Sequence, residues 1–328
     1  PEDFVKETVE GIVAAYGDRV KLLNDDFRVL LNAHETRDGK VGIVTGGGSG
    51  HLPLFLGYVG DGMLDGCVIG NVFASPAYTK MADAIKACDK GAGVLCLYGN
   101  YGGDKMNFNQ AIEDVEFDDI KCTTVLGADD VASAPKEEKE KRRGVAGIVY
   151  AYKCAGAAAS RGYDLEKVTS IAQKACDSVR TMGFALTPCI VPEVGKATFS
   201  VAEDEIEIGM GIHGEKGIDV QKMLTADEIA TIAVEKITAD MPLASGDEVS
   251  VLINGLGGTP SEEQFIVYRK VNEMLSAMGV KIFMPHIGEY ATSMEMAGLS
   301  VSIIKLDEEL KSLLMDPADT PFYTNHNK

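Results

Sequence analysis

VGIVTGGGSGH, residues 41–51, joins a short apolar run to a glycine-rich loop that ends in histidine. An apolar run of this length, ended by glycine, is typical of a strand covered on both faces in a parallel sheet. Similar runs occur at 94–98 and 122–126, and a helix-like apolar repeat occupies 4–16. This alternation of strand-like and helix-like segments predicts an α/β first domain with a parallel or mixed sheet.

The second half of the chain has a different pattern. In 205–212, EIEIGMGI, apolar residues alternate with polar residues or glycine, which predicts a half-buried strand. Two capping-box patterns, Thr225 with Glu228 and Ser261 with Gln264, each precede a helix-like apolar repeat. Further strands are expected at 249–254, 280–284 and 301–306. These segments predict an α+β domain.

A domain boundary is expected near Gly183. The Ala-rich segment 144–183 carries an apolar helical face, and Gly183 suits a C-terminal helix cap. We therefore predict an α/β domain at 1–183 and an α+β domain at 184–328, with the last residues able to pack back on the first domain. The charged stretch 136–143, KEEKEKRR, indicates a solvated loop or helix end.

Composition and charge limit the classes of partner. The chain of 328 residues carries 31 Lys and Arg against 50 Asp and Glu, a formal charge of -19. Such a surface repels phosphate backbones, which argues against nucleic acid as a partner. Because neither a bilayer-spanning apolar run nor a leader pattern is found, a cytoplasmic protein without a membrane partner is expected. The seven cysteines form no CxxC pair, which fits reduced thiols in the core.

The loop at 46–51 is the first candidate for a ligand site. Glycine is needed where φ is positive or where a side chain would block a ligand, and clustered amides form a nest for anions or hydroxyls. Spacing from Gly46 puts His51 where a dinucleotide fingerprint has its third glycine, and no GxxxxGK[ST] loop occurs. We therefore expect no nucleotide site on this chain.

The second candidate is the loop at 98–108, YGNYGGDKMNF, which also follows a predicted strand. In open parallel sheets, ligands bind outside the carboxyl ends of the strands. The two loops should therefore meet at one edge of the sheet and bring Asp104 near His51. An alternative is that Asp104 is a helix N-cap.

The third candidate is GMGIHGE, residues 209–215, at the end of the alternating segment. If the Ile and Met residues face the core, His213 points the other way with Gly209 and Gly211, whose missing side chains would leave an open slot beside the ring. A neutral imidazole nitrogen is a nucleophile toward a carbonyl when the other nitrogen is held as a donor. The alternative is a partly exposed polar residue at a strand end. No metal site with sensible ligand spacing is predicted.

Together these segments resemble the dihydroxyacetone kinase family, in particular its substrate-binding (DhaK-like) subunit, over essentially the whole chain. The resemblance depends on several motifs rather than on one. The matching segments are GGGSGH at 46–51, NVFASP at 71–76, NYGGD at 100–104, RRGVAG at 142–147, GIHGE at 211–215 and NGLGGTP at 254–260.

The resemblance implies a phosphotransferase with an alcohol acceptor, and it implies roles for particular residues. His213 would add to the ketone carbonyl of a short ketose and form a hemiaminal, which selects against polyols such as glycerol. Asp104 would be the general base or proton relay for the hydroxyl to be phosphorylated, and His51 would bind the hydroxyls. The residues expected to orient the substrate are Gly48, Ser49, Gly50 and Ser75.

The resemblance also implies partners. A separate helical nucleotide-binding (DhaL-like) subunit would carry ATP, or ADP rephosphorylated by the sugar phosphotransferase system, together with Mg²⁺. This chain would bind no cofactor itself. A homodimer is expected from the family alone.

Two positions depart from the family's usual pattern. Leu52 stands where Glu usually precedes Pro53, and Gly99 stands where Lys is usual. Loss of a long cationic side chain at Gly99 makes room in the pocket wall. A four-carbon ketose such as erythrulose therefore rivals dihydroxyacetone as the substrate, and Gly99 joins the expected substrate-binding residues.

A second class of function stays open. The family includes paralogues that bind dihydroxyacetone covalently and act as coactivators of a transcription regulator, and His213 would serve either role. Retention of both His51 and Asp104 favours the kinase, because a sensor needs no proton transfer.

Overall fold

The computed structural model describes residues 2–34 and 36–326. The chain divides into two compact units, each made of more than one segment. The first unit comprises Pro1–Gly127, Val149–Ala175 and Glu309–Lys328, and the second comprises Ala128–Ile148 and Cys176–Glu308.

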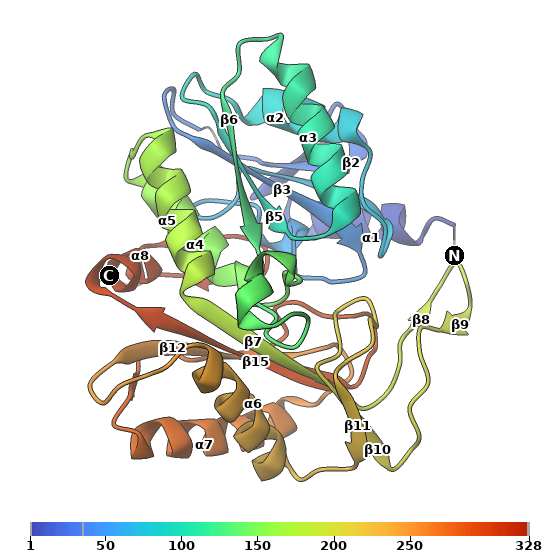
Figure 1. The fold of residues 1–328 in the computed structure, drawn as a ribbon. Helices are drawn as coiled ribbons and strands as arrows, with labels where there is room; N and C mark the ends of the chain where they lie inside the picture. The colour runs from blue at the N-terminus through green and yellow to red at the C-terminus, as the bar shows by residue number, and fades with distance from the viewer. Residues whose placement is uncertain (1, 35, 327–328) are drawn as a thin grey trace. The chain divides into compact units, whose positions relative to one another are not determined.

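The first unit is built on a six-stranded mixed sheet in the order β1-β2-β4-β3-β5-β6 (Figure 1). Strands β3 to β6 run parallel to one another, whereas β2 is antiparallel to both β4 and β1. The predicted strands at 41–45, 94–98 and 122–126 are thereby confirmed. The strands are β1 Val20–Leu23, β2 Asp26–Asn32, β3 Gly42–Ser49, β4 Gly66–Val72, β5 Val94–Gly99 and β6 Cys122–Gly127.

Helices cover both faces of this sheet, which explains why β3, β4 and β5 are buried along almost their whole length. On one face, Val44 of β3 packs with Met81 of α2 and Phe108 of α3. On the other face, the hydroxyl of Thr45, the next residue on β3, forms a 2.8 Å hydrogen bond with the hydroxyl of Tyr152 on α4. Figure 1 shows α4 and α5 on the side away from α2 and α3. The helices are α1 Phe4–Tyr16, α2 Tyr78–Cys88, α3 Gly102–Glu116, α4 Ile148–Ser160, α5 Leu165–Asp177 and α8 Glu308–Met315.

The second unit has a seven-stranded sheet in the order β11-β10-β7-β15-β12-β13, with β14 also paired to β12. Helices α6 (Ala226–Asp240) and α7 (Ser261–Ala277) pack on one face and complete an apolar core (Figure 1). The strands are β7 Val179–Ala185, β10 Glu205–Ile208, β11 Asp219–Lys222, β12 Glu248–Gly255, β13 Lys281–Ile282, β14 His286–Gly288 and β15 Gly298–Leu306.

Short elements complete the two units. The first unit also contains η1 Leu56–Tyr58, β16 Ala318–Asp319 and β17 Thr324–Asn325, and the second contains η2 Lys136–Lys141, β8 Ile190–Val191 and β9 Lys196–Ala197. No helix in the described part of the chain has both the length and the apolar character needed to cross a bilayer.

The division differs from the single predicted boundary between 183 and 184. Gly183 is not a helix cap but lies within β7, which pairs with β15 and β10 in the second unit. A Cβ at Gly183 would lie 2.8 Å from the carbonyl oxygen of Met210, so glycine is needed there for close backbone packing. The last residues belong to the first unit, where Lys153 donates to the carbonyl of Leu313 at 2.7 Å.

Two smaller predictions on the second unit also need correction. The alternating segment is a strand only over Glu205–Ile208, because Gly209 turns the chain with φ +82°. The capping box of Thr225 and Glu228 is confirmed. At the second pattern, however, Ser261 is already helical and its N-cap is Pro260, so no capping box forms.

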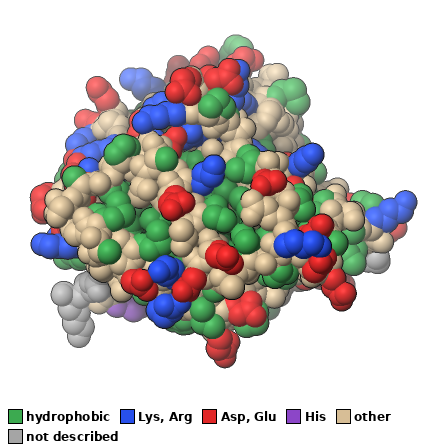
Figure 2. Space-filling model, turned by 60° about the horizontal axis from the view of Figure 1, so that its bottom comes forward, with side chains coloured by type: hydrophobic (Ala, Val, Ile, Leu, Met, Phe, Trp, Pro, Cys, Tyr) green, Lys and Arg blue, Asp and Glu red, His purple; other side chains and the backbone are tan. Residues whose placement is uncertain are grey.

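The predicted solvated stretch at 136–143 is only partly exposed. Residues 136–141 are exposed, but Arg142 is 2% exposed and its guanidinium donates to both carboxylate oxygens of Asp240. On the face shown in Figure 2, basic and acidic side chains are interspersed among apolar ones.

Candidate functional site

In the first unit, the two glycine-rich loops leave the same edge of the sheet, as predicted. Strands β3 and β5 are parallel neighbours, so the loops after Ser49 and Gly99 both follow carboxyl ends. The segment after β4 joins them there, because a Cβ at Gly103 would lie 2.6 Å from Oγ of Ser75. The amide of Asn107 also donates to the carbonyl of Pro76 at 2.9 Å. Ser75 is thereby held against the first turn of α3.

The glycines of the first loop are needed for close packing. Gly48 leaves room for the backbone of Phe73, and a Cβ at Gly50, where φ is +99°, would lie 2.8 Å from the Phe73 ring. The hydroxyl of Ser49 donates to the carbonyl of Gly70 at 2.8 Å, which ties β3 to β4. The imidazole of His51 stacks on the Phe73 ring with centroids 4.9 Å apart. The loop therefore fixes the plane of the His51 ring.

Asp104 is a buried acid in the first turn of α3. The N-cap of that helix is Tyr101 and makes no side-chain capping bond, so the alternative that Asp104 is the N-cap is wrong. Asp104 and His51 are 5% and 1% exposed. The positive end of the helix dipole favours the ionised form of a carboxylate placed there. Burial raises the pKa of the neighbouring Tyr98, and the charges of Cys96 and Asp104 add to that rise.

In the second unit, His213 lies in a turn after β10. As predicted, Ile206, Ile208 and Met210 are buried, whereas the His213 side chain is 22% exposed. The backbone N–H of His213 donates to Oε2 of Glu215 at 2.9 Å, and its Nδ1 lies 3.0 Å from Oε1 of the same carboxylate. Glu215 therefore holds both the backbone and the ring of His213.

The ionisation state of Glu215 decides which group donates in its hydrogen bond with Nδ1 of His213. Burial opposes ionisation of Glu215, but the hydrogen bond and charge of His213 outweigh it and lower the pKa to about 2. An ionised carboxylate only accepts hydrogen bonds, so Nδ1 of His213 must be the donor. The lone pair of the neutral ring is then on Nε2. The sequence alone gives Glu215 no role, although its spacing from His213 lies within the GIHGE motif.

The sequence predicted an open slot beside His213 where Gly209 and Gly211 lack side chains, but protein groups occupy that space. A Cβ at Gly211 would lie 2.2 Å from Oε2 of Glu215 and 2.5 Å from Nη1 of Arg143, so those two side chains fill the space. At Gly209, the neighbour is the Cβ of Ala132 at 2.6 Å. At both glycines, the missing side chain leaves room for protein groups that pack around the histidine turn.

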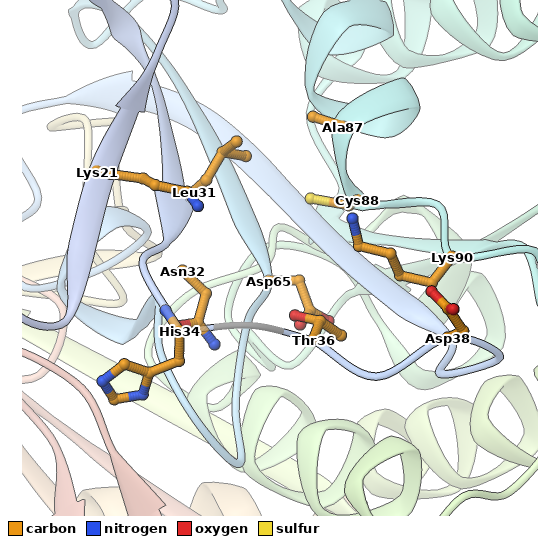
Figure 3. A pocket seen from close by; sticks show the side chains of 10 residues that line it. All are labelled: Lys21, Leu31, Asn32, His34, Thr36, Asp38, Asp65, Ala87, Cys88 and Lys90. Carbon is orange, nitrogen blue, oxygen red and sulfur yellow. The ribbon is translucent and has the colours of Figure 1, made fainter.

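Within 2–34 and 36–326, no group of three or more His, Cys, Asp or Glu is arranged to hold a metal ion. A cavity of about 360 Å³ lies in the first unit at the β1–β2 edge, where Figure 3 shows Lys21 and Lys90 reaching toward one another. Its lining residues are Lys21, Leu31, Asn32, His34, Thr36, Asp38, Asp65, Ala87, Cys88 and Lys90. None of them is a predicted site residue.

Known proteins are similar to this chain over almost its whole length. The Dak1 domain matches residues 10–322. The PTS-dependent dihydroxyacetone kinase 2, dihydroxyacetone-binding subunit DhaK, of Listeria innocua is 46% identical over 98% of this chain and 96% of its own. The L-erythrulose kinase of Pectobacterium atrosepticum is 41% identical over 98% of this chain and 55% of its own. Among solved structures, the dihydroxyacetone kinase operon co-activator Dha-DhaQ has a TM-score of 0.91 at 30% identity, with 98% of each chain covered.

The matched range includes the segments that carry the three candidate residues His51, Asp104 and His213. Both the family match and the relatives agree with the resemblance drawn from the sequence motifs. The chain therefore belongs to the Dak1 family, that of the dihydroxyacetone-binding kinase subunits.

Proposed function

We propose that this chain is the substrate-binding subunit of a dihydroxyacetone-type kinase and captures a short-chain ketose as a hemiaminal on His213. The observation that carries the proposal is the contact between Nδ1 of His213 and the carboxylate of Glu215. By accepting from Nδ1–H, Glu215 leaves the lone pair on Nε2 for attack on a carbonyl carbon.

The capture step balances without a cofactor. Nε2 bonds to the carbonyl carbon, and the π-electron pair moves to the carbonyl oxygen. The ring becomes cationic, and the Glu215 carboxylate stabilises that charge. The Nδ1 proton then leaves and the oxygen takes one up, so the net change is one proton moved from nitrogen to oxygen. A polyol without a carbonyl does not react, which gives selectivity against glycerol.

The residues of the first unit would serve the phosphoryl transfer. Asp104 would act as general base or proton relay for the substrate hydroxyl, and His51 would bind the hydroxyls. Burial of both side chains supports this role, because protein dipoles rather than water then stabilise the charges that form. Substrate orientation would come from Gly48, Ser49, Gly50, Ser75 and Gly99.

The phosphoryl donor would be held by a separate helical nucleotide-binding subunit, as ATP or as ADP rephosphorylated by the phosphotransferase system, with Mg²⁺. The PTS-dependent relative of Listeria supports the second donor. We further propose that this chain acts as a homodimer.

Two substrates remain in competition. The relative at 46% identity is named for dihydroxyacetone and the one at 41% for L-erythrulose. Gly99 ends β5 and presents no side chain, which favours the larger ketose on steric grounds. We propose a four-carbon ketose as a substrate alongside dihydroxyacetone.

A ketose-sensing coactivator is the second candidate function. It is supported by the similarity in fold to the co-activator Dha-DhaQ. The presence of His51 and Asp104 in buried positions favours the kinase, because sensing needs no base for a hydroxyl proton. Phosphorylated ketose formed with a nucleotide-binding subunit and its donor would decide for the kinase.

The capture step can be tested directly. Dihydroxyacetone or erythrulose labelled with ¹³C at the carbonyl is added to the protein, and the ¹³C spectrum is recorded with native mass spectra. The expected result is a protein-bound signal in the range of tetrahedral carbon and a mass increase of one ketose. His213→Ala should abolish both, and His326→Ala, an exposed histidine, should change neither. A wild-type protein that binds ketose only as the free ketone would refute the proposal.

A further inference from the structure

We propose that Arg143 is a positioning residue for His213: held by Asp130, it fixes the carboxylate that orients the imidazole. The inference rests on the proposed function and adds two residues to it. All the groups involved belong to the second unit.

Arg143 is clamped at several points. Its Nε donates to Oδ2 of Asp130 at 2.9 Å, and its Nη2 lies 2.8 Å from the same oxygen. Nη2 also donates to the carbonyl of Gly209 at 3.0 Å, where β10 has just ended. The side chains of Arg143 and Asp130 are 14% and 3% exposed. The guanidinium therefore joins the 130–133 turn to the start of the histidine turn.

The remaining nitrogen of Arg143 faces Glu215. Nη1 lies 3.9 Å from Oε2 of Glu215, the same oxygen that accepts from the backbone N–H of His213. The contacts thus form a line from Asp130 through Arg143 and Glu215 to the ring of His213. At this distance the positive charge of Arg143 adds to that of His213 in favouring the ionised carboxylate, which keeps an acceptor in front of Nδ1.

Gly211 makes this arrangement possible. Both Glu215 and Arg143 occupy the space that a side chain at 211 would need. The amide of Gly211 also donates to the carbonyl of Glu215 at 3.0 Å, which closes the turn around the histidine. Position 211 therefore needs a glycine, because the guanidinium of Arg143 and the carboxylate of Glu215 approach the backbone there.

Asp130 and Arg143 depend on each other. Burial raises the pKa of Asp130 to about 6, although the charge of Arg143 and the N–H of Ala132 oppose that rise. Without Arg143, this buried acid would lose the partner that favours its ionised form. The planar fork of arginine lets one side chain reach Asp130, Gly209 and Glu215 together, which lysine does not.

Arg142, the neighbouring arginine, has contacts that indicate a purely structural role. Arg142 is 2% exposed and donates to Asp240 and to the carbonyl of Ala134. Those contacts join the 134–142 segment to the end of α6. Of the two arginines in the RRGVAG motif, Arg143 faces the carboxylate of Glu215, which in turn contacts the ring of His213.

The test measures the tautomer of His213 in the ligand-free protein, together with the rate of ketose capture. ¹⁵N-histidine spectra, assigned with His213→Ala, are recorded for the wild type, Arg143→Gln, Arg143→Lys and Lys216→Gln. The last variant removes one exposed charge from the same turn and is the matched control. We expect the Nδ1–H form in the wild type and the control, a mixture in Arg143→Gln, and an intermediate state in Arg143→Lys.

Capture should slow by about 10–100-fold in Arg143→Gln, the range typical of groups that orient a functional histidine. Unchanged tautomer and rate would overturn the inference. If Arg143→Gln fails to fold, Arg143→Lys is measured instead, and wild-type behaviour in it overturns the proposal equally. A wild type that captures no ketose refutes the proposed function, whereas the tautomer spectra still report on Arg143.

Discussion

The Oε1 atom of Glu215 lies 3.0 Å from Nδ1 of His213, and Oε2 accepts the backbone N–H of the same histidine at 2.9 Å. One carboxylate therefore fixes both the ring and the main chain of a single residue. Two contacts to one carboxylate restrict the imidazole more than a single hydrogen bond would. A nucleophile that must meet a small carbonyl carbon gains rate from such restriction.

Replacing Glu215 by Gln should impair capture while keeping the shape of the side chain. The amide can donate to Nδ1, which would stabilise the tautomer with the lone pair on the wrong nitrogen. We expect capture to slow by roughly 10²–10⁴-fold, since a comparable Asp→Asn change beside a catalytic histidine costs about 10⁴. The rate of appearance of the ¹³C tetrahedral signal measures it, and Glu193→Gln, an exposed change in the same unit, is the control. Capture at the wild-type rate would contradict the assigned tautomer.

Acid should weaken the second unit through Asp240. Hydrogen bonds from Arg142 lower the pKa of Asp240 from 3.8 to about 2. Burial opposes this shift, and the hydrogen bond from Arg180 adds to it. A carboxyl with a lowered folded-state pKa adds stability that is present above its unfolded pKa and is lost as pH falls through the folded value. This contribution should therefore be complete above pH 3.8 and disappear toward pH 2.

Asp240→Asn tests that contribution. Because Arg142 is buried, loss of its ionised partner should cost about 3–5 kcal/mol in the free energy of unfolding at pH 7. Asp227→Asn breaks an exposed pair with Arg269 on the same unit and should cost less than about 1 kcal/mol. Urea unfolding at neutral and at low pH measures both. Equal effects of the two variants, or a pH-independent difference, would count against this account.

Much of the fold could be predicted from apolar periodicity. Helix α1 has the predicted limits, and β3, β5 and β6 lie where short apolar runs end in glycine. The prediction failed at β7, because Val179 continues the spacing of the preceding helical face although α5 ends at Asp177. Strand pairing across the second unit decides that segment, and pairing partners far apart in sequence leave no local pattern.

The part of the candidate site that follows from sheet topology could be predicted from the sequence. The parallel order of β3 and β5 is enough to bring the loops of His51 and Asp104 to one edge. The surroundings of His213 were not predictable in the same way. Gly211 gives no sign in the sequence that Arg143, far upstream, fills its space, so the glycines suggested an empty slot.

Asp104→Asn should separate capture from phosphoryl transfer. The amide keeps the size of the side chain but cannot accept the hydroxyl proton, so transfer should fall by about 10²–10⁴-fold. Capture on His213 should be unchanged. A coupled assay with the nucleotide-binding subunit measures transfer, and the ¹³C signal measures capture in the same sample. Asp114→Asn, an exposed acid on the same helix, is the control. Loss of capture together with transfer would contradict the division of roles.

Gly99→Lys tests the basis of substrate size. The residue ends β5 at the sheet edge that carries the loops of His51 and Asp104, so a long side chain there would enter the same region. We expect the ratio of kcat/KM for erythrulose over dihydroxyacetone to fall, by about 10-fold for roughly 1.4 kcal/mol of lost transition-state binding. A loss of activity toward both ketoses would indicate misfolding, which the melting temperature and the capture of dihydroxyacetone would reveal. Gly11→Lys, at an exposed position of α1 where an added Cβ would meet nothing within 4 Å, controls for added charge in the same unit. If Gly99→Lys left the ratio unchanged while dihydroxyacetone was still phosphorylated, the absence of a side chain at position 99 would not explain the choice of ketose.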